Sequence, residues 1–486
     1  SVTKYSSLEN MFKTGTFVVV ASILAQVYAY TPEALADQIT NLPGAENLDV
    51  TFNQFSGYLN IPGGSGNSKF MHYWFVESMN APATDPISFW TNGGPGCSGL
   101  IGFMTEMGPF KPQADMTLTF NDYAWNQNTN MVYIESPAGV GFSYSTAPEI
   151  DYTTGDAQTA LDNYNLIQAF MVRFPEYSSN SLYISSESYG GHYMPTLAKQ
   201  IVDENSAAAT TGNPVLNFKG FAVGNPYTDS YSGTPAMFDT FWGHQLLPKP
   251  TYDEYVSECV KAVRPNLKKC VQLQIDMNNL VGNLNPYALD YPVCTTDSPA
   301  RRGRAQRTWL LNQMLHKVAP EDRKLMGVTL KDEYEPCADD YADTYLNQAS
   351  VKTAIHVKDD LKWESCSYKI SYNTTDSTEV STAPIYNYLI DGNYGLNILV
   401  YSGDDDSVCG TIGTQSWIWD LGYTVSGKAW QTYTVDQQVA GYLTQWQNTK
   451  LGFLTIHGAG HEVPTYKPAV ALDMWTRYLN GEFTKA

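Results

Sequence analysis

Three residue types that together activate a hydroxyl group occur in this sequence in the order serine, aspartate, histidine. Ser188 is followed by a tyrosine and two glycines, Asp406 ends a run of three aspartates, and His461 follows two nearby glycines. A serine becomes a nucleophile when a histidine accepts its proton and a carboxylate holds that histidine in the correct tautomer. If the fold brings these side chains together, the sequence predicts acyl-transfer chemistry.

Ser188 lies between a predicted strand and a predicted helix. Residues 181–185 alternate polar and apolar side chains, and from Tyr193 apolar residues recur every four positions, with a proline in the first turn of the helix. This layout is typical of a nucleophile elbow, which usually has glycine two residues before and two after the serine. Gly190 fits that pattern, whereas Ser186 replaces the first glycine. The alternative is a glycine-rich turn that contains serines by chance.

Asp406 and His461 also follow predicted strands, at 396–402 and 452–456. In α/β-hydrolases the nucleophile, acid and base occur in this order, each after a strand. Because three independent elements agree, the elbow is favoured over a chance turn.

The other histidines are weaker candidates for the base. His72 lies within a predicted strand and His356 on a predicted helix, which indicates structural roles, and His192 follows the serine too closely. His457 is four residues from His461, a spacing that on a helix could bind a metal, but the glycines between them disfavour a helix. No metal site and no cofactor are expected.

Strands and helices alternate along most of the chain, which predicts the α/β class with a central, mostly parallel sheet. Between residues 230 and 342 the pattern becomes polar and mostly helical, and we interpret this stretch as an inserted cap domain. The cap divides the core into residues 30–229 and 343–486. Its basic run at 301–307 is interpreted as a solvated loop, with a processing site as the alternative. Other strands are expected at 55–61, 69–76, 86–91, 130–135 and 218–225, and other helices at 159–174, 350–356 and 468–479.

Composition and termini restrict the compartment and the partners. The formal net charge is −20 and no stripe of Lys or Arg is present, so nucleic acid is not an expected partner. Residues 11–29 resemble a secretory signal, with 1–10 upstream of it, and no apolar run is long enough to span a membrane. A secreted or vacuolar or lysosomal location is therefore expected, and Asn373 is the one glycosylation acceptor.

Five blocks of sequence resemble the serine carboxypeptidase family, the group of carboxypeptidase Y and lysosomal protective protein. The resemblance extends over about residues 58–479, is weakest in the cap, and implies an α/β-hydrolase fold. Ser186 is the main departure from the family pattern. The blocks cover residues 90–98, 135–145, 187–193, 402–406 and 458–464.

The resemblance implies a role for each matching residue. Ser188 would be the nucleophile, His461 the base, and Asp406 the acid, since it matches the last aspartate of the family's Gly-Asp-x-Asp. The backbone N–H groups of Gly94 and Tyr189 would form the oxyanion hole. The C-terminal carboxylate of the substrate would be bound by Asn92, Gly93, Glu106 and Glu187.

Seven cysteines in a secretory chain allow three disulfides and one thiol, and the absence of Cys-x-x-Cys disfavours a zinc or redox cluster. The resemblance pairs Cys97 with Cys366. Cys409, three residues after Asp406, is expected to be the free thiol, close to His461. The remaining pairs are expected within the cap, Cys259 with Cys270 and Cys294 with Cys337.

The expected function is that of a serine-type carboxypeptidase acting on peptides and proteins with a free C-terminus. Two glutamates and a substrate carboxylate cannot all be ionised in one small site, so activity on peptides is expected to be best at acidic pH. Two alternatives remain at this point. One is a carboxypeptidase-like acyltransferase with the same triad, and the other is a non-catalytic partner that stabilises other hydrolases. The sequence does not predict the oligomeric state.

Overall fold

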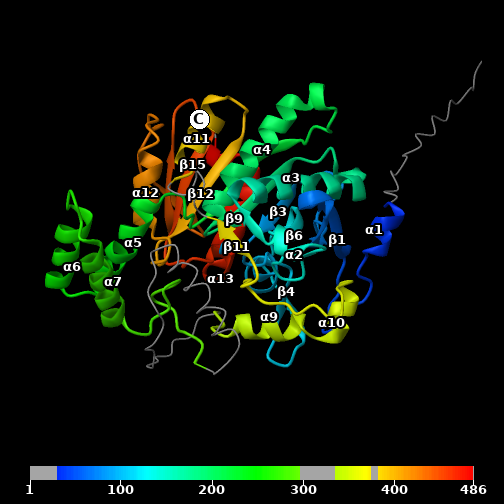
Figure 1. Cartoon of the computed structure of the whole chain (residues 1–486), viewed down its shortest axis with the longest axis horizontal. Helices are drawn as coiled ribbons and strands as arrows, with labels where there is room; N and C mark the ends of the chain where they lie inside the picture. The colour runs from blue at the N-terminus through cyan, green and yellow to red at the C-terminus, as the bar shows by residue number, and fades with distance from the viewer. Residues whose placement is uncertain (1–29, 296–333, 374–380, 485–486) are drawn as a thin grey trace, which may run out of the picture.

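The structure is a computed structural model that describes residues 30–295, 334–373 and 381–484 (Figure 1). The predicted signal segment 1–29, most of the predicted glycosylation motif after Asn373, and the basic run 301–307 lie outside these residues.

A single large sheet crosses the molecule. Its eleven strands run in the order β1-β2-β6-β3-β9-β10-β12-β15-β14-β13, with β7 pairing beside β2. The strands from β6 to β15 are parallel, and the outer pairs at both edges are antiparallel. The predicted α/β class with a mostly parallel central sheet is confirmed. The strands are β1 (Gln54–Pro62), β2 (Ser68–Val76), β3 (Ile87–Thr91), β6 (Asn130–Ile134), β7 (Tyr144–Ser145), β9 (Leu182–Glu187), β10 (Phe218–Gly224), β12 (Asn397–Gly403), β13 (Gln431–Val435), β14 (Gln438–Gln445) and β15 (Leu451–Ile456).

The hairpin of β13 and β14 was not predicted from the sequence. Its two-residue turn consists of Asp436 and Gln437, both with positive φ, at 48° and 64°. Two-residue hairpin turns of this kind usually contain Asn-Gly or Asp-Gly. Because no glycine marks this turn, the sequence carries no clear hairpin signal here.

Side chains alternate between two cores, one on each face of the sheet. On β2, Tyr73 and Phe75 point into a core shared with α1 (Pro32–Ala36), α3 (Asp156–Arg173) and α4 (Gly190–Thr211). Trp74 and Val76 point into the opposite core, which includes α14 (Pro468–Leu479) and α9 (Ala338–Leu346). The sheet is therefore covered on both faces, as its buried strands require. Two more helices flank the sheet, α11 (Ala383–Asp391) and α12 (Thr411–Trp419).

Helix α3 begins three residues before its predicted start, and two further helix boundaries differ from the sequence prediction. Helix α4 begins at Gly190 rather than near Tyr193, so Pro195 lies inside the helix. A proline there cannot donate to the carbonyl of Gly191, and the hydroxyl of Thr382 donates to that oxygen instead, at 2.7 Å. This outside donor lets the helix start directly after the elbow.

The other difference is at α10 (Ala349–Ala354), which was expected to reach His356. His356 has φ of 59° and lies beyond the helix, where its Nδ1 contacts the carbonyl oxygen of Ser56 at 2.8 Å. The left-handed backbone ends the helical hydrogen bonding, and the histidine keeps the structural role predicted for it.

Residues between β10 and β12 build a separate small core. Helices α5 (Ser230–Gly243), α6 (Lys249–Tyr255) and α7 (Leu267–Val281) pack on one another through Phe238, Tyr255 and Met277. Figure 1 shows α6 and α7 projecting beyond the sheet. Within 230–295 and 334–342 no strand joins the main sheet, and α9 crosses the predicted cap boundary at residue 342.

Among the residues that the structure describes, no helix combines the length and the apolar character needed to cross a bilayer.

Candidate active site

Ser188 occupies a tight turn between β9 and α4. Its φ is 60°, in the left-handed region, and its backbone N–H donates to the carbonyl of Gly224 at 3.0 Å. A β-carbon at Gly190 would lie 2.2 Å from the Oγ of Ser186. Glycine at 190 therefore makes room for the serine at 186, and the departure from the family pattern is accommodated within the elbow.

Asp406, in the loop after β12, is fully buried and receives hydrogen bonds on both oxygens. Its Oδ2 accepts from the Nδ1 of His461 at 2.7 Å and from the Nδ2 of Asn225 at 2.9 Å. The backbone N–H groups of Val408 and Cys409 donate at 2.7 and 3.1 Å. Four donors fix the position of this carboxylate against the histidine ring.

The neighbouring aspartates face other partners. Asp404 receives the N–H of Gly458 at 2.6 Å and contacts the exposed His457 at 2.8 Å. Asp405 accepts the N–H of Asp290, from the cap region, at 3.0 Å. Of the three aspartates, only Asp406 is hydrogen-bonded to His461.

His461, in the loop after β15, is 2% exposed. Burial lowers the pKa of its imidazole, but the charge and hydrogen bond of Asp406, helped by Glu462 and Glu106, outweigh burial and raise that pKa above its usual value. The ring meets Tyr287 edge-on, with centroids 5.1 Å apart. Such an imidazole can accept a proton and stabilise it as an ion pair with Asp406.

The Ser188 hydroxyl lies close enough to the thiol of Cys409 to lower the pKa of that thiol in part. Within the described chain, no hydrogen bond joins that hydroxyl to His461. Nucleophile–base hydrogen bonds in free enzymes are often loose and tighten when substrate binds. The three loops thus bring the serine, acid and base together, with the acid–base contact already formed.

The loop after β3 packs directly on the elbow. A β-carbon at Gly93 would lie 2.4 Å from the backbone nitrogen of Tyr189 and 2.8 Å from the Cβ of Ser188, so only glycine fits. Gly94 has φ of 114°. Among the described residues, the backbone N–H groups of Gly94 and Tyr189 make no hydrogen bond. Both donors are available beside Ser188 for a developing oxyanion.

Asn92 joins the two glutamates of the predicted carboxylate-binding set. Its Nδ2 donates to Glu106 Oε1 at 2.9 Å and to Glu187 Oε1 at 2.8 Å. Its Oδ1 accepts from Trp90 and Gly102, which fixes the orientation of the amide. Glu106 is 1% exposed and Glu187 4%, so a buried cluster of two carboxyl groups and one amide lies next to the nucleophile.

Tyr401 on β12 lies against the same cluster. Burial, followed by the charges of Glu187 and Glu106, raises the pKa of its phenol well above the usual value. The neutral phenol of Tyr401 therefore lies between the sheet and the glutamate cluster.

The cysteines pair as expected. Cys97–Cys366 links the loop after β3 to a segment 269 residues further along the chain, and the two cap disulfides are Cys259–Cys270 and Cys294–Cys337. Cys409 is free and buried. Burial, then the charges of Asp406 and Glu187, raises the pKa of its thiol, so the sulfur stays protonated near neutral pH.

One group of possible metal ligands overlaps this site. Ligand atoms of Asp406, Cys409 and His461 lie within 4.8 Å of one another. Two of these residues are already hydrogen-bonded to each other, and the third keeps its proton, so the arrangement suits serine chemistry better than a resident metal.

Sequence analysis did not identify Asn225, whose side chain donates a hydrogen bond to Asp406. Besides Asp406, it bonds the backbone of Gly403 on β12, receiving its N–H at 2.8 Å. Its place at the end of a predicted strand was the available signal, since side chains at the carboxyl ends of neighbouring parallel strands meet at one edge of the sheet.

A family model described as serine carboxypeptidase matches residues 43–481. The chain belongs to the serine carboxypeptidase family. Two relatives from Arabidopsis thaliana show the extent of the similarity. Serine carboxypeptidase-like 25 is 36% identical over 460 residues, covering 93% of this chain and 92% of the relative. Serine carboxypeptidase 24 is 33% identical over 476 residues, covering 96% and 97%.

A solved structure agrees with the fold. A prohormone-processing carboxypeptidase from Saccharomyces cerevisiae superposes with a TM-score of 0.70 at 19% identity, over 93% of this chain and 97% of the yeast chain. The α/β-hydrolase fold expected from the family resemblance is thereby confirmed.

Proposed function

We propose that this member of the family is a serine-type carboxypeptidase that releases the C-terminal residue of peptides through an acyl-enzyme. One observation carries the proposal. The buried Asn92–Glu106–Glu187 cluster lies directly beside Ser188, because Glu187 is its neighbour in the chain and Asn92 bonds that glutamate. A free C-terminal carboxylate bound there would place the last peptide bond of the substrate at the serine.

In the acylation step, Ser188 Oγ attacks the carbonyl carbon of the last peptide bond and His461 takes the hydroxyl proton. The negative charge that develops on the carbonyl oxygen is stabilised by the N–H groups of Gly94 and Tyr189. The C–N bond then breaks, His461 gives its proton to the departing amino group, and the C-terminal residue leaves as a free amino acid. Asp406 stabilises the imidazolium throughout.

Water completes the cycle. It loses a proton to His461, attacks the ester carbonyl of the acyl-enzyme, and releases the shortened peptide as Ser188 recovers its proton. An alcohol in place of this water would give the acyltransferase reaction. The two glutamates support peptide hydrolysis, since they suit a substrate that carries a C-terminal carboxylate.

The glutamates also support an acidic working range for peptides. Two buried carboxyl groups and the substrate's carboxylate repel one another when all are ionised, whereas a proton held among them turns repulsion into a hydrogen bond. Binding of a peptide is therefore expected to weaken as pH rises.

Three disulfides fit an oxidising compartment. We propose that the protein enters the secretory pathway by the segment at 11–29 and works outside the cell or in a vacuole or lysosome. Asn373 is exposed, as a glycosylation site would be. The cap at 230–342 and its flanking core segments remain our interpretation of the domain organisation.

Replacing Ser188 by alanine tests the proposal. The variant is expected to lose release of free amino acids from an N-blocked dipeptide, while circular dichroism and melting temperature stay close to those of the parent. Retained peptide hydrolysis would contradict the proposal. Parallel assays with a glucose ester and an acceptor alcohol distinguish hydrolysis from acyl transfer.

A further inference from the structure

A short segment of the predicted cap lies across the two loops that carry the acid and the base. Residues 285–291, which we call the strap, follow α7 and contain neither helix nor strand. The carbonyl of Pro286 accepts the backbone N–H and the hydroxyl of Ser407 at 3.1 and 2.6 Å. The carbonyl of Tyr287 accepts the N–H of His461 at 2.7 Å. The strap therefore joins the loop after β12 to the loop after β15.

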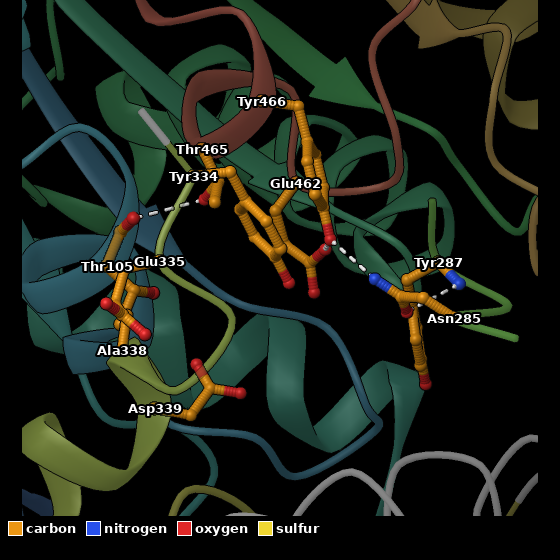
Figure 2. Close-up of a pocket in the computed structure, with 10 residues that line it drawn as sticks. All are labelled: Thr105, Asn285, Tyr287, Tyr334, Glu335, Ala338, Asp339, Glu462, Thr465 and Tyr466. Atoms are coloured by element: carbon orange, nitrogen blue, oxygen red, sulfur yellow. Dashed lines mark hydrogen bonds between the residues drawn. The ribbon is translucent and has the colours of Figure 1, made fainter. Parts of the chain in front are cut away.

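Two further contacts fix the strap on the base loop. The hydroxyl of Tyr291 donates to the carbonyl of Gly458 at 3.1 Å. The amide of Asn285 donates to the hydroxyl of Tyr466 at 3.4 Å, and Figure 2 shows these two side chains meeting. Because Gly458 precedes His461 and Tyr466 follows it, the strap is attached to this loop on both sides of the histidine.

Asp405 fixes the strap on the acid loop. This aspartate directly precedes Asp406 and is 2% exposed. Its backbone carbonyl accepts the N–H of Leu289 at 3.1 Å, and its Oδ2 accepts the N–H of Asp290 at 3.0 Å. Its Oδ1 is also buried, and among the described residues no hydrogen bond reaches that atom. A buried carboxylate oxygen without a donor is costly unless a cation compensates it.

His244 faces that oxygen from the cap. It follows the last turn of α5, and its Nε2 lies 3.4 Å from Asp405 Oδ1. Its Nδ1 lies 3.0 Å from the carbonyl oxygen of Thr240. Both ring nitrogens therefore face acceptors, and a neutral imidazole, which has a single N–H, can satisfy only one of them. The protonated ring is the form that fits this position.

Helix α5 gives His244 a firm support. A β-carbon at Gly413 of α12 would lie 2.8 Å from the β-carbon of Ala236 on α5, and one at Gly410 would lie 2.6 Å from the hydroxyl oxygen of Thr240. The two helices are therefore in close contact, and α12 directly follows the acid loop. This packing holds His244 at a fixed place beside that loop.

The charges around the pair also favour the protonated ring. The contact with Asp405 raises the pKa of His244 to about 8, against the effect of partial burial, and the charge of Asp290 acts in the same direction. Helix α12 has no titratable side chain. The other acidic side chains of α5 and the acid loop have partners of their own: Asp239 with Tyr252, Asp404 with His457, and Asp406 with His461.

The sign of the pH dependence follows from this raised pKa. A histidine whose pKa is higher in the folded protein stabilises the fold fully below its ordinary pKa of 6.5 and loses that contribution as pH rises through about 8. Above that pH, Asp405 loses its cation while its carboxylate remains shielded from water. The attachment of the strap to the acid loop is therefore expected to weaken in alkaline solution.

We propose that Asp405 is a positioning residue for the catalytic pair, held in this role by protonated His244. The ion pair fixes the strap on the acid loop, and the strap holds the loops of Asp406 and His461 in place relative to each other. The inference rests on the proposed function for the roles of those two residues. Asp405 itself touches neither substrate nor the reacting atoms.

The test measures hydrolysis of an ester of an N-blocked amino acid, which depends on the triad and not on recognition of a C-terminal carboxylate. Variants are made at His244, whose side chain is 30% exposed, so that the buried Asp405 stays in place. The wild-type kcat is expected to fall as pH rises through about 8. His244→Gln, neutral at every pH, is expected to lower kcat about tenfold at about pH 7, with KM within about twofold, and to remove that fall.

His244→Lys restores a cation at the same position. The ordinary pKa of lysine is about 10.4, so the fall in kcat is expected to move to higher pH, and kcat at about pH 7 to recover towards the wild-type value. Glutamine and lysine both remove the imidazole ring and its contact with Thr240. A difference between these two variants therefore reports the charge alone.

His457→Gln is the matched control. His457 lies 2.8 Å from Asp404 and so forms the same kind of pair between neighbouring loops, but its side chain is 69% exposed. Exposed ion pairs contribute little, so this variant is expected to keep the wild-type kcat and its fall at alkaline pH.

A titration followed by NMR of histidine labelled with carbon-13 gives a readout besides activity. The resonance that is missing in His244→Gln is expected to titrate near pH 8 in the wild-type protein. A midpoint at or below 6.5, a His244→Gln enzyme with wild-type kcat, or identical pH profiles for the glutamine and lysine variants overturns this inference. Ester hydrolysis with the expected pH profiles, but no release of amino acids from blocked peptides, would support this inference and overturn the proposed function.

Discussion

Two buried histidine–aspartate pairs lie on either side of the elbow, and they have nearly the same contact geometry. In one, His461 Nδ1 and Asp406 Oδ2 are 2.7 Å apart; in the other, His192 Nδ1 and Asp156 Oδ2 are 2.9 Å apart. Both histidines are 2% exposed or less. The pairs differ in what surrounds the ring.

The ring of His192 lies nearly parallel to two tyrosine rings, with centroids 4.6 Å from Tyr189 and 5.7 Å from Tyr227. Its aspartate also accepts the hydroxyls of Tyr189 at 3.0 Å and Tyr372 at 2.8 Å. This pair is enclosed by aromatic side chains and anchors the first turn of α4. Among the described aromatic residues, His461 instead meets only Tyr287, edge-on. On the proposed mechanism, the two pairs would therefore differ in whether the ring's second nitrogen can reach a substrate.

The largest effect expected from this comparison is on kcat. Asp406→Asn removes the charge that holds the His461 tautomer and should lower kcat about 10⁴-fold. Asp156→Asn should lower kcat less than tenfold but reduce the free energy of unfolding by about 1–3 kcal/mol, since a buried charged acceptor is lost. Steady-state kinetics and urea unfolding of both variants measure the contrast. Equal losses of kcat would show that the second pair also takes part in catalysis.

The next effect concerns pH. His461 has a raised pKa, so a substrate without a terminal carboxylate, such as an ester, should lose activity as pH falls through a value above the usual 6.5. Peptides, which depend on the glutamate cluster, should be favoured at lower pH than esters. Superimposable pH profiles of kcat/KM for peptide and ester would contradict this separation.

Variants of the glutamates sharpen the pH prediction. Glu106→Gln should lower kcat/KM for peptides by about 10²-fold while affecting esters less. The charge of Glu106 helps to raise the pKa of His461. The same variant should therefore move the acid limb of the kcat/KM profile for esters to lower pH. Glu187→Gln should lower kcat/KM for peptides in the same way. An equal loss of kcat/KM for peptides and esters would argue against recognition of the substrate carboxylate by these glutamates.

Cys409 offers a chemical probe of the surroundings of Ser188. Its thiol lies near the Ser188 hydroxyl, so a bulky mercurial bound to it should block the nucleophile. Its raised pKa predicts slow alkylation by iodoacetamide at neutral pH. Cys409→Ser should remove the sensitivity to the mercurial, and a variant that remains sensitive would place the modified group elsewhere.

The smallest effect is on stability alone. Thr382→Val removes the hydroxyl that donates to the buried Gly191 carbonyl, where Pro195 cannot. The expected loss is about 1–2 kcal/mol in the free energy of unfolding, with kcat within a few-fold of the parent. Chemical denaturation with an activity assay measures both, and a large fall in kcat without loss of stability would give Thr382 a catalytic role.

Much of the site followed from the sequence because it depends on strand ends. The order of Ser188, Asp406 and His461 along the chain is visible in the sequence, because each of them follows an apolar strand. The contacts around these residues are not local, although Asn225 also ends a predicted strand. Asp156 lies 36 residues before His192, and Asn225 lies 181 residues before Asp406, so both contacts arise only when the sheet assembles.

The most direct test of the central claim is covalent labelling with a fluorophosphonate, followed by peptide mass spectrometry. The account predicts one adduct per protein, on Ser188, with complete loss of peptide hydrolysis, and much slower labelling of the Asp406→Asn variant than of Asp156→Asn. Labelling at another residue, or peptide hydrolysis that survives full modification of Ser188, would contradict it.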